Sequence, residues 1–314
     1  MVLSMRGEFH DFDALAAAAR GWGLDWIQLD RGPLEASFQQ VETPSTLISR
    51  FKFNRKFHQM GTIPPGMRTF GMIAPRSPDI EWRGKEGTPR HLIVFPSDDE
   101  FEFISHPGFH GDTLSVPEHR LRQAADTLGL PDPLDGMGAG QALYHTDPGC
   151  IDGFRQRLTE LLTLGARFDG SGLDCSVLAD VEFSAIAALV ATLASGIRAG
   201  HRIPESGLRA RALRLAVKFI DDHAAEPPTV EQICRASGAS WRTLDYAFRD
   251  QFDLTPKQYL QTVRLQRVRR DLLRKSPDSS ISDVAAGWGF LQEADVVTSE
   301  HDQTLASRDS RAGP

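Results

Sequence analysis

Hydrophobic and polar residues alternate over short stretches in the first third of the chain. The stretches are bounded by Gly and Pro, which interrupt strands and favour turns. Period-two alternation in short segments is typical of β-strands with one buried face, and strands at this spacing predict an antiparallel sandwich or small barrel. The predicted strands are Leu24–Leu29, Leu34–Val41, Thr46–Phe53, Arg68–Ile73, His91–Phe95, Glu100–Ile104 and Asp112–Val116.

From about Pro117 onward the hydrophobic period becomes that of an α-helix. One segment, Leu178–Ile197, is apolar around most of its circumference but too short and interrupted to span a membrane, so we expect a buried or dimer-forming helix. Strands followed by helices predict an α+β fold, antiparallel and β-rich in its first half. The predicted helices of this region are Pro117–Leu128, Cys150–Leu164, Leu178–Ile197 and Leu208–Ala225.

Composition changes mark the boundaries between these regions. Gly129–Gly149 is rich in Gly, Pro and Asp and predicts a loop, and Gly200–Gly207 contains Pro204 and predicts a hinge. A chain of 314 residues that is 40% hydrophobic can bury two cores. We therefore expect a first domain at 1–200, β-rich to about 116 and helical over 117–200, a linker at 201–207, a helical domain at 208–300 and a disordered tail at 301–314.

The segment from Thr229 to Gly238 has the pattern of a short capped helix followed by a turn. Thr229 and Gln232 have the spacing of a capping box, in which each side chain bonds the other residue's backbone N–H. Val230 and Ile233 are the apolar positions expected to point inward. Gly238 then permits a tight turn.

A second helix follows this turn. Ser240 is the expected N-cap, and Leu244, Phe248 and Phe252 recur every four residues, so they share one buried face. A short helix, a glycine turn and a second helix with a polar exposed face is the layout of a helix-turn-helix that reads the major groove of DNA. The residues left on the exposed face are Arg242, Asp245, Tyr246 and Arg249.

Three spaced runs in this region resemble the AraC family of bacterial transcription regulators. They are S-x-R-T-L-x-x-x-F-R at Ser240–Arg249, L-T-P-x-x-Y-L at Leu254–Leu260 and R-L-x-x-V-R-x-x-L-L at Arg264–Leu273. The resemblance covers roughly the last third of the chain and implies two helix-turn-helix subdomains joined by a long helix that begins at Thr255-Pro256.

The resemblance also implies properties of the whole protein. These are a cupin-like N-terminal sensor domain with a helical dimerisation element, a homodimer that binds double-stranded DNA, and a location in the bacterial cytoplasm without a membrane anchor. Two roles stay open: an activator, for which RNA polymerase is a further candidate partner, or a repressor. Ala14–Ala19 follows acidic residues and predicts a helix rather than a secretory leader.

The apolar spacing of Leu265, Val268 and Leu272 fits an ordinary helical bundle as well as a DNA-binding unit. The distribution of charge distinguishes the two. Residues 208–275 contain fourteen Lys or Arg and eight Asp or Glu, a balance of +6, whereas the whole chain carries −7. A basic segment attached to an acidic remainder favours a surface that binds phosphates.

The expected DNA-facing residues differ in what they indicate. Arg242, near the start of the second helix, either donates two hydrogen bonds to a guanine, or contacts a phosphate, or stays in solvent. Asp245 and Tyr246 stand where the family usually has longer polar or cationic residues, which leaves the base preference open. The full expected set is Ser240, Trp241, Arg242, Thr243, Asp245, Tyr246, Arg249 and Arg264.

A second helix-turn-helix begins at Ser280, which is the expected cap of a helix carrying Val284 and Ala285. The turn Gly287–Phe290 matches the family, but the sequence after it does not, and Glu300 stands where a buried Phe is expected. Two hypotheses stay open: a lost reading frame just after Phe290, or a divergent tail that still forms a poor helix.

No pattern in the chain indicates an enzyme, a metal site or a cofactor. The three cysteines form no CxxC pair, and phosphate-binding loops and Ser/His/Asp arrangements are missing. Histidines among the strands lack the H-x-H spacing of cupin metal sites, so scattered surface positions explain them better. These histidines are His91, His106, His110 and His119.

A small-molecule effector pocket is the remaining candidate for the β-rich half. Aromatic residues on its strands either line a barrel mouth or form ordinary core, and Arg50, Arg55 and Arg68 either hold an anionic ligand or are solvated. We expect a two-domain, effector-responsive transcription factor; the alternative is a sensor or interaction protein that has lost specific DNA binding. The aromatic residues are Trp26, Phe38, Phe51, Phe53, Phe70 and Trp82.

Overall fold

The computed structural model describes residues 2–135, 137, 140, 142–167, 175–198, 207–274 and 280–290. The chain forms two compact units. Unit 1 comprises Met1–Trp26, Leu34–Asn54 and Gln59–Glu205, and unit 2 comprises Ile27–Pro33, Arg55–His58 and Ser206–Pro314.

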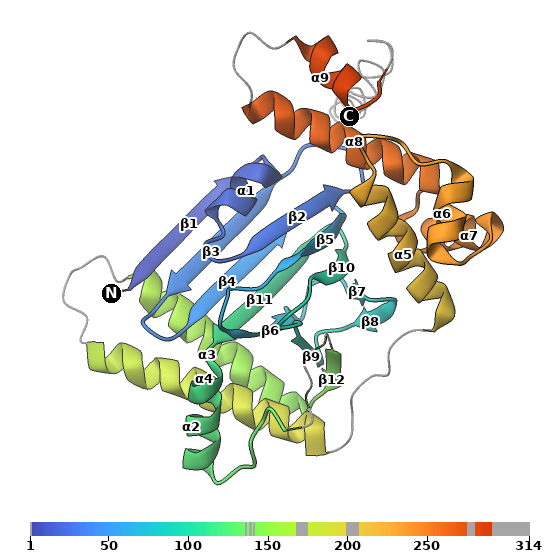
Figure 1. Ribbon diagram of the computed structural model, residues 1–314. Coiled ribbons are helices and arrows are strands. Elements are labelled where there is room, and N and C mark those ends of the chain that lie inside the picture. Colours follow the sequence, from blue (N-terminus) through green and yellow to red (C-terminus); the bar gives the residue numbers. More distant parts are fainter. Residues whose placement is uncertain are drawn as a thin grey trace, which may run out of the picture. The chain divides into compact units, whose positions relative to one another are not determined.

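Two sheets make up the β-rich part of the fold (Figure 1). The seven-stranded sheet has the order β1-β3-β4-β11-β6-β9-β12 and the five-stranded sheet β2-β5-β10-β7-β8. The larger sheet contains β1 (Leu3–Phe9), β3 (Ala36–Glu42), β4 (Leu47–Phe53), β6 (Arg68–Ile73), β9 (His91–Val94), β11 (Phe109–Val116) and β12 (Ala142–His145). The smaller contains β2 (Gly23–Gln28), β5 (Phe57–Thr62), β7 (Ile80–Trp82), β8 (Lys85–Gly87) and β10 (Phe101–Ser105).

Helices cover one face of the seven-stranded sheet. Alternate residues of its strands, including Ile48, Phe70 and Leu114, pack with helical residues such as Phe154 and Leu189 in one buried cluster. Period-two alternation places those strand residues on the same face, so the helices shield a continuous apolar surface. The helices of unit 1 are α1 (Phe12–Ala18), α2 (Glu118–Leu128), α3 (Pro148–Ala166) and α4 (Cys175–Arg198).

The antiparallel, β-rich half followed by helices is confirmed. Each of the seven predicted strands overlaps an observed strand, and β6 has the predicted bounds. The predicted loop Gly129–Gly149 is wrong over Ala142–His145, which pairs with β9 as strand β12. This four-residue strand is too short for its alternation to stand out among the surrounding glycines. The pattern also missed β1, β5, β7 and β8.

Helix α4 belongs to the core of unit 1. Its segment Ser176–Gly196 is long and apolar enough to cross a membrane by length and composition. However, Ile186, Leu189 and Leu193 are fully buried, and they pack in the cluster beneath the seven-stranded sheet. The expectation of a buried helix is therefore confirmed, but the expectation that the segment is too short to span a membrane is wrong; its hydropathy is that of a core helix.

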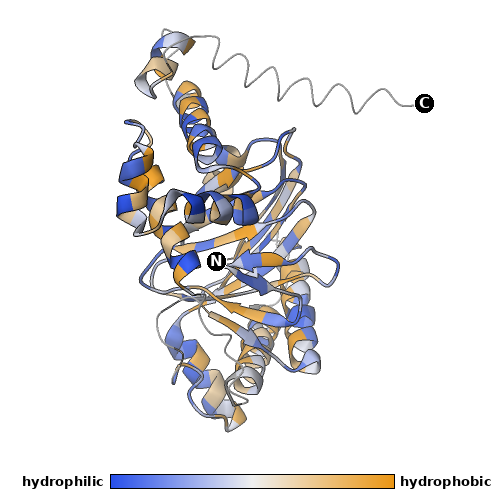
Figure 2. Ribbon diagram, turned by 90° about the vertical axis from the view of Figure 1, so that its right-hand side faces the viewer, coloured by the Kyte–Doolittle hydropathy of each residue, from blue (hydrophilic) through white to orange (hydrophobic). Residues whose placement is uncertain are grey.

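Unit 2 contains five described helices. Each of these helices carries both polar and apolar residues, as the mixed colours of Figure 2 show. This is the pattern of small amphipathic helices packed on one another. The helices are α5 (Leu208–Asp222), α6 (Val230–Ser237), α7 (Trp241–Phe252), α8 (Pro256–Arg274) and α9 (Ile281–Gly287).

A buried ion pair ties the seven-stranded sheet to α3. Arg50 Nε and one Arg50 terminal nitrogen donate to the two Asp112 carboxylate oxygens at 2.7 and 2.8 Å, and Arg50 also donates to Thr159 on α3. Burial acts to raise the pKa of Asp112, but the hydrogen bonds and charge of Arg50, with His110 nearby, outweigh it and hold that pKa below its ordinary value. Asp112 therefore stays ionised and paired at neutral pH.

Two histidines face each other across strands β9 and β12. His91 and His145 are register partners, with His91 Nε2 2.8 Å from His145 Nδ1. The backbone N–H of Thr88 donates to His91 Nδ1 at 2.9 Å. Burial, together with repulsion from His145, lowers the pKa of His91 to about 4. The neutral imidazole is thus the form that the fold requires.

We expect His91 to make stability depend on pH between about 6.5 and 4. In this window the unfolded chain binds a proton at His91 and the folded chain does not, so the free energy of unfolding falls as the pH falls. The contribution approaches about 1.4 kcal/mol per pH unit. Urea unfolding of the wild type and His91→Gln from pH 7.5 to 4.5 measures it, and the variant should show a flatter dependence. The exposed His119→Asn is the control, and equal slopes for wild type and His91→Gln would contradict the assignment.

Candidate nucleic-acid interface

Helix α6 begins and ends as its sequence predicts. The Thr229 side chain accepts from the backbone N–H of Gln232, and the Gln232 side chain accepts from that of Thr229, which completes the capping box. Gly238 ends the helix in the left-handed region with φ of 66°. Ile233 is buried as expected, but the expectation for Val230 is wrong, since it is 48% exposed at the first turn of the helix.

Helix α7 presents a polar face above a buried apolar one. Its cap Ser240 accepts from the backbone N–H of Thr243. The predicted inward residues Leu244, Phe248 and Phe252 are at most 1% exposed, so the four-residue spacing identified the buried face correctly. The exposed face carries Arg242, Tyr246 and Arg249, with Trp241, Thr243 and Asp245 partly exposed beside them.

Contacts between neighbours preorganise this face. The Arg242 guanidinium lies over the Tyr246 ring, 5.7 Å from its centre, and Arg249 Nε donates to Asp245 at 3.0 Å. Asp245 therefore has a cationic partner one helical turn away, which reduces its repulsion of phosphates. An aromatic ring under a guanidinium restricts Arg242 to fewer rotamers and keeps its hydrogen-bond donors outward.

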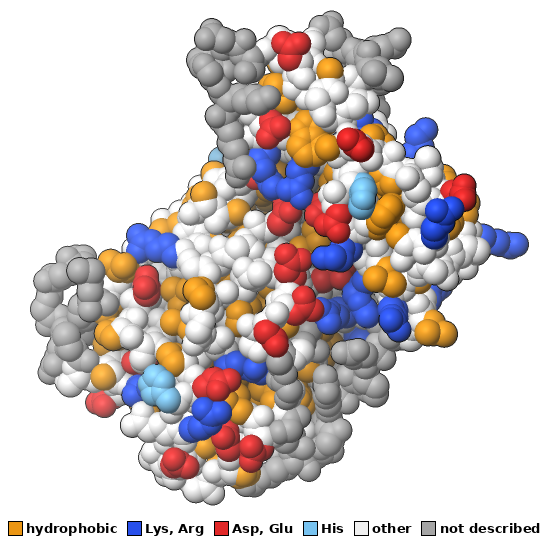
Figure 3. Space-filling model, viewed as in Figure 1, with side chains coloured by type: hydrophobic (Ala, Val, Ile, Leu, Met, Phe, Trp, Pro, Cys, Tyr) orange, Lys and Arg blue, Asp and Glu red, His pale blue; other side chains and the backbone are white. Residues whose placement is uncertain are grey.

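Helix α5 contributes a cation that the sequence interpretation missed. Arg209 lines an open hollow together with Thr243, Tyr246, Arg249 and Asp250 of α7, and its guanidinium is 3.4 Å from the Asp250 carboxylate. Figure 3 shows Lys and Arg side chains on the lobe that Figure 1 draws as α5 to α7. The signal was present in the basic N-terminal half of α5, but only packing places Arg209 beside α7.

Arg264 lies apart from the exposed face of α7 and contacts the turn that follows α9. Its Nε donates to the Trp288 carbonyl oxygen at 2.6 Å, and its guanidinium lies 4.5 Å from the centre of the Phe290 ring. Pro256 is the first residue of α8, as expected, and Thr255 and Gln258 cap this helix by exchanging hydrogen bonds. The sequence run that contains Arg264 thus includes an internal support for α9.

The first half of the second helix-turn-helix is formed. Ser280 caps α9 by accepting from Asp283 N–H, and Val284 and Ala285 pack with Val268 and Phe290 in one buried cluster. Leu265 and Leu272 of the predicted core stripe are partly buried against the same cluster. The expectations for Val296, Glu300 and the tail at 301–314 lie outside the described residues.

Histidines and cysteines gather into no metal site in the described part of the chain, where no three His, Cys, Asp or Glu side chains come together. His106 lies 3.5 Å from Glu81, and His110 lies beside Asp112. Cys150 and Cys234 are free thiols. The exposed face of α7 carries arginine and hydrogen-bonding side chains, whose chemistry suits phosphate and base contacts.

The chain is similar to bacterial regulators in its C-terminal part. A family model described as a helix-turn-helix domain matches residues 233–296. A probable thc operon regulatory protein of Rhodococcus erythropolis is 38% identical over 106 residues, which cover 32% of each chain. The HTH-type transcriptional activator RhaS of Escherichia fergusonii is 31% identical over 177 residues, 56% of this chain and 57% of that one. The chain thus spans between a third and somewhat more than half of these curated relatives.

Two solved structures also align with most of the chain. The AraC-like transcriptional activator CuxR is 16% identical with a TM-score of 0.43, and the alignment covers 91% of this chain and 100% of that one. The fatty-acid-bound ToxT of Vibrio cholerae is 10% identical with a TM-score of 0.32, covering 82% and 90%. The family match itself continues six residues past Phe290, to residue 296.

Two glycines of unit 2 allow a matched test of the turn between α6 and α7. A Cβ atom at Gly238 or at Gly287 would meet no atom within 4 Å, but only Gly238 has a left-handed backbone. We expect Gly238→Ala to lower the free energy of unfolding by about 1–2 kcal/mol. Gly287→Ala, in helical backbone, should be neutral or stabilise by up to about 1 kcal/mol. Urea unfolding followed by circular dichroism measures both, and equal effects of the two substitutions would contradict a backbone origin.

Proposed function

We propose that this chain, whose residues 233–296 belong to the helix-turn-helix domain family of AraC-type regulators, is a transcription factor that binds specific promoter DNA and responds to a small-molecule effector. The observation that carries the proposal is the exposed face of α7, where Arg242, Tyr246 and Arg249 lie above a fully buried apolar face. A helix packed on a buried apolar face, with arginine, tyrosine and other polar side chains on its outer face, is suited to the major groove.

Each DNA-facing residue has a proposed role. Arg242, whose guanidinium lies over the Tyr246 ring, donates two hydrogen bonds to the edge of a guanine. Arg249 and Arg209 contact phosphates on either side of the groove. The N-terminal turn of α7 adds backbone N–H groups that favour an anionic phosphate near the cap. The residues Ser240, Trp241, Thr243 and Asp245 complete the surface, and Arg264 acts through the turn that it supports.

We extend the proposal by analogy with the family. Residues 1–200 form the sensor and dimerisation domain, 201–207 the linker and 208–300 the DNA-binding domain of a cytoplasmic homodimer. As an activator it contacts RNA polymerase, and it performs no catalysis. An effector that binds one conformation of the dimer better than another shifts the population toward it, and this changes how two DNA-binding units meet neighbouring half-sites.

A second candidate function is a sensor or interaction protein without specific DNA binding. It is favoured by the ion pair between Asp245 and Arg249, which lowers the positive charge that α7 offers to DNA. The match to the family model also ends at residue 296. The two candidates differ in whether DNA affinity depends on sequence.

Binding of the full chain to the promoter fragment upstream of its own gene, against a scrambled fragment, separates these candidates. We expect specific binding that weakens steeply between 50 and 200 mM salt, because neutralised phosphates release counterions. Arg242→Ala should weaken specific binding by about 1–3 kcal/mol and reduce discrimination between the fragments. Fluorescence anisotropy at two salt concentrations measures both effects.

Arg122→Ala is the matched control, since it removes an arginine from the exposed surface of α2 in unit 1. It should leave the affinity for both fragments unchanged. Equal weak binding of the wild type to both fragments would contradict the proposed function and support the second candidate.

A further inference from the structure

Strand β1 forms one edge of the seven-stranded sheet of unit 1, and Figure 1 draws it as the outermost strand of that sheet. On one side its residues pair with β3, from Leu3 opposite Glu42 to Phe9 opposite Ala36. Among the strands of the described residues, none pairs with its other side. Alternate residues of a strand direct their N–H and C=O groups to opposite sides, so β1 offers a row of backbone donors and acceptors to a further strand.

The two edges of this sheet differ in what they offer. The opposite edge is β12, which is only four residues long, and a short edge strand gives little surface for pairing. Strand β1 is seven residues long, contains no proline and pairs with β3 without a bulge. A regular edge of this length is a template on which another extended strand can add.

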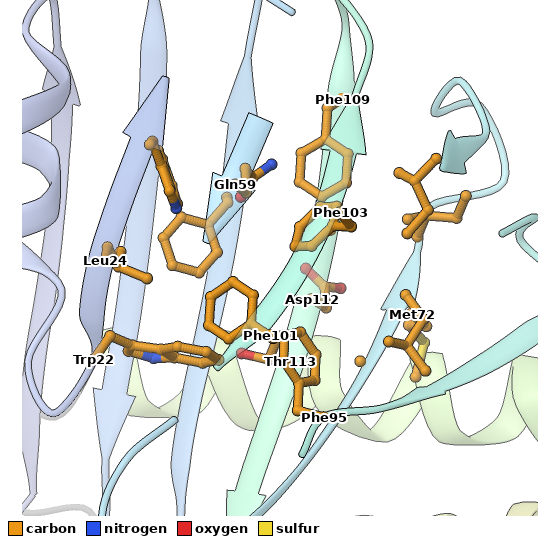
Figure 4. Close-up of a pocket in the computed structure, with 17 residues that line it drawn as sticks. Trp22, Leu24, Gln59, Met72, Phe95, Phe101, Phe103, Phe109, Asp112 and Thr113 are labelled. Atoms are coloured by element: carbon orange, nitrogen blue, oxygen red, sulfur yellow. The ribbon is translucent and has the colours of Figure 1, made fainter. Parts of the chain in front are cut away.

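The apolar residues of β1 lie at the margin of the core between the two sheets. A small cavity of about 40 Å³ lies within that core, and Figure 4 shows aromatic side chains such as Trp22, Phe101 and Phe109 around it. None of the described residues that line this aromatic cavity comes from β1. Met5 and Phe9, on the same face of the strand, are only partly buried, so they can still bury apolar surface against a partner.

The other face of β1 carries two charges of opposite sign. Arg6 and Glu8 are exposed, and because they are two positions apart they project from the same face of the strand. No ion pair or hydrogen bond joins either side chain to another described residue. Charges of one sign on an edge repel any copy of that edge, whereas an arginine and a glutamate on one strand can attract it.

The order of residues along β1 complements itself in one register. In an antiparallel pair of β1 strands centred on Gly7, Arg6 of each copy lies opposite Glu8 of the other, and opposite charges in this position attract. Met5 of each copy then lies opposite Phe9 of the other. Centring the pair on Arg6 or on Glu8 instead would bring like charges together. A centre between two residues would place Glu8 opposite Met5 or Arg6 opposite Phe9.

Gly7 suits the centre of such a pair, where the same residue of each copy meets itself. A Cβ atom at Gly7 would lie 3.0 Å from the Phe9 ring, so this ring already leans over the glycine. Each copy thus brings its Phe9 ring toward the axis that relates the two strands. There the ring can pack on Met5 of the other copy, because opposite residues of paired strands are close neighbours.

We propose that two copies of this chain pair through β1, with the two strands antiparallel about Gly7 and the two seven-stranded sheets joined into one. Backbone hydrogen bonds between the strands provide affinity, and the two pairs of Arg6 and Glu8 define the register and the partner. The inference rests on the proposed function in one respect, since it names the interface of the homodimer. Dimerisation itself is measured on the full chain without DNA.

Sedimentation equilibrium of the full chain over a wide range of protein concentrations tests the pairing. We expect the wild type to dimerise reversibly. Arg6→Glu or Glu8→Arg replaces two attractions by two repulsions and should weaken dimerisation at least about tenfold. The double variant Arg6→Glu/Glu8→Arg restores opposite charges in the same register, so its dimerisation should return to within about threefold of the wild type.

Arg76→Glu is the matched control, because it reverses the charge of an exposed arginine just after β6, which β3, β4 and β11 separate from β1. It should leave dimerisation unchanged, and circular dichroism confirms that each variant is folded. A wild type that stays monomeric at every concentration would overturn the proposal. Dimerisation of folded Arg6→Glu and Glu8→Arg as strong as that of the wild type would also overturn it.

Cysteine substitutions test the register. When Arg6→Cys and Glu8→Cys chains are mixed, the two thiols lie opposite each other only in a mixed dimer centred on Gly7, and only thiols this close can form a disulfide. Mild oxidation of the mixture should give a covalent dimer on a non-reducing gel, and each variant alone should give much less. The wild type controls for the native thiols of Cys150 and Cys234. A mixture that cross-links no more than Arg6→Cys alone would overturn the proposed pairing.

Promoter binding, measured beside sedimentation, separates this inference from the proposed function. A dimer that depends on Arg6 and Glu8 but shows no sequence-specific DNA binding would leave this inference supported and the proposed function contradicted. Specific DNA binding by a chain whose dimerisation is unaffected by Arg6→Glu and Glu8→Arg would overturn the interface alone.

Discussion

Burial of both faces of the seven-stranded sheet is the constraint on which unit 1 depends. One face packs on α2, α3 and α4, and the other faces the five-stranded sheet across the aromatic cavity. Because successive residues of a strand point to opposite faces, each strand must satisfy two different environments at once. On β11, Leu114 packs toward the helices while Thr113 and Gly111 face the cavity. A one-residue shift in register would exchange these roles, so the pairing of the strands also decides which residues face the helices and which face the second sheet.

The ion pair between Arg50 and Asp112 joins neighbouring strands of this sheet and ties them to α3. Both residues lie on the strand face of Ile48 and Leu114, which packs toward the helices, and the guanidinium reaches Thr159 on α3. A buried charge pair is stable only with complete hydrogen bonding, and here two direct contacts and the α3 hydroxyl supply it. The pair therefore couples the position of α3 to strands β4 and β11.

The pair of helices α6 and α7 depends on local interactions because both helices are short. Helices of eight to twelve residues are marginal alone in water, so caps and tertiary contacts decide whether they form. The capping box of α6, the Ser240 cap and the left-handed Gly238 fix the ends of both helices. Leu244 and Phe248 then hold α7 from beneath. Rigid support below leaves the outer face free to be polar, which is what recognition of a nucleic acid requires.

The sequence by itself determined the features that rest on neighbouring residues. The caps at Thr229 and Ser240, the buried face of α7 and most strands depend on contacts within a few residues, so spacing alone predicts them. Tertiary structure decided the rest. Arg50 contacts Asp112, 62 residues away in the sequence, and Arg264 contacts Trp288, 24 residues away. The aromatic side chains between the two sheets come from strands of both sheets. Such contacts depend on strand register and on how layers pack, and no local periodicity encodes which distant side chains come together.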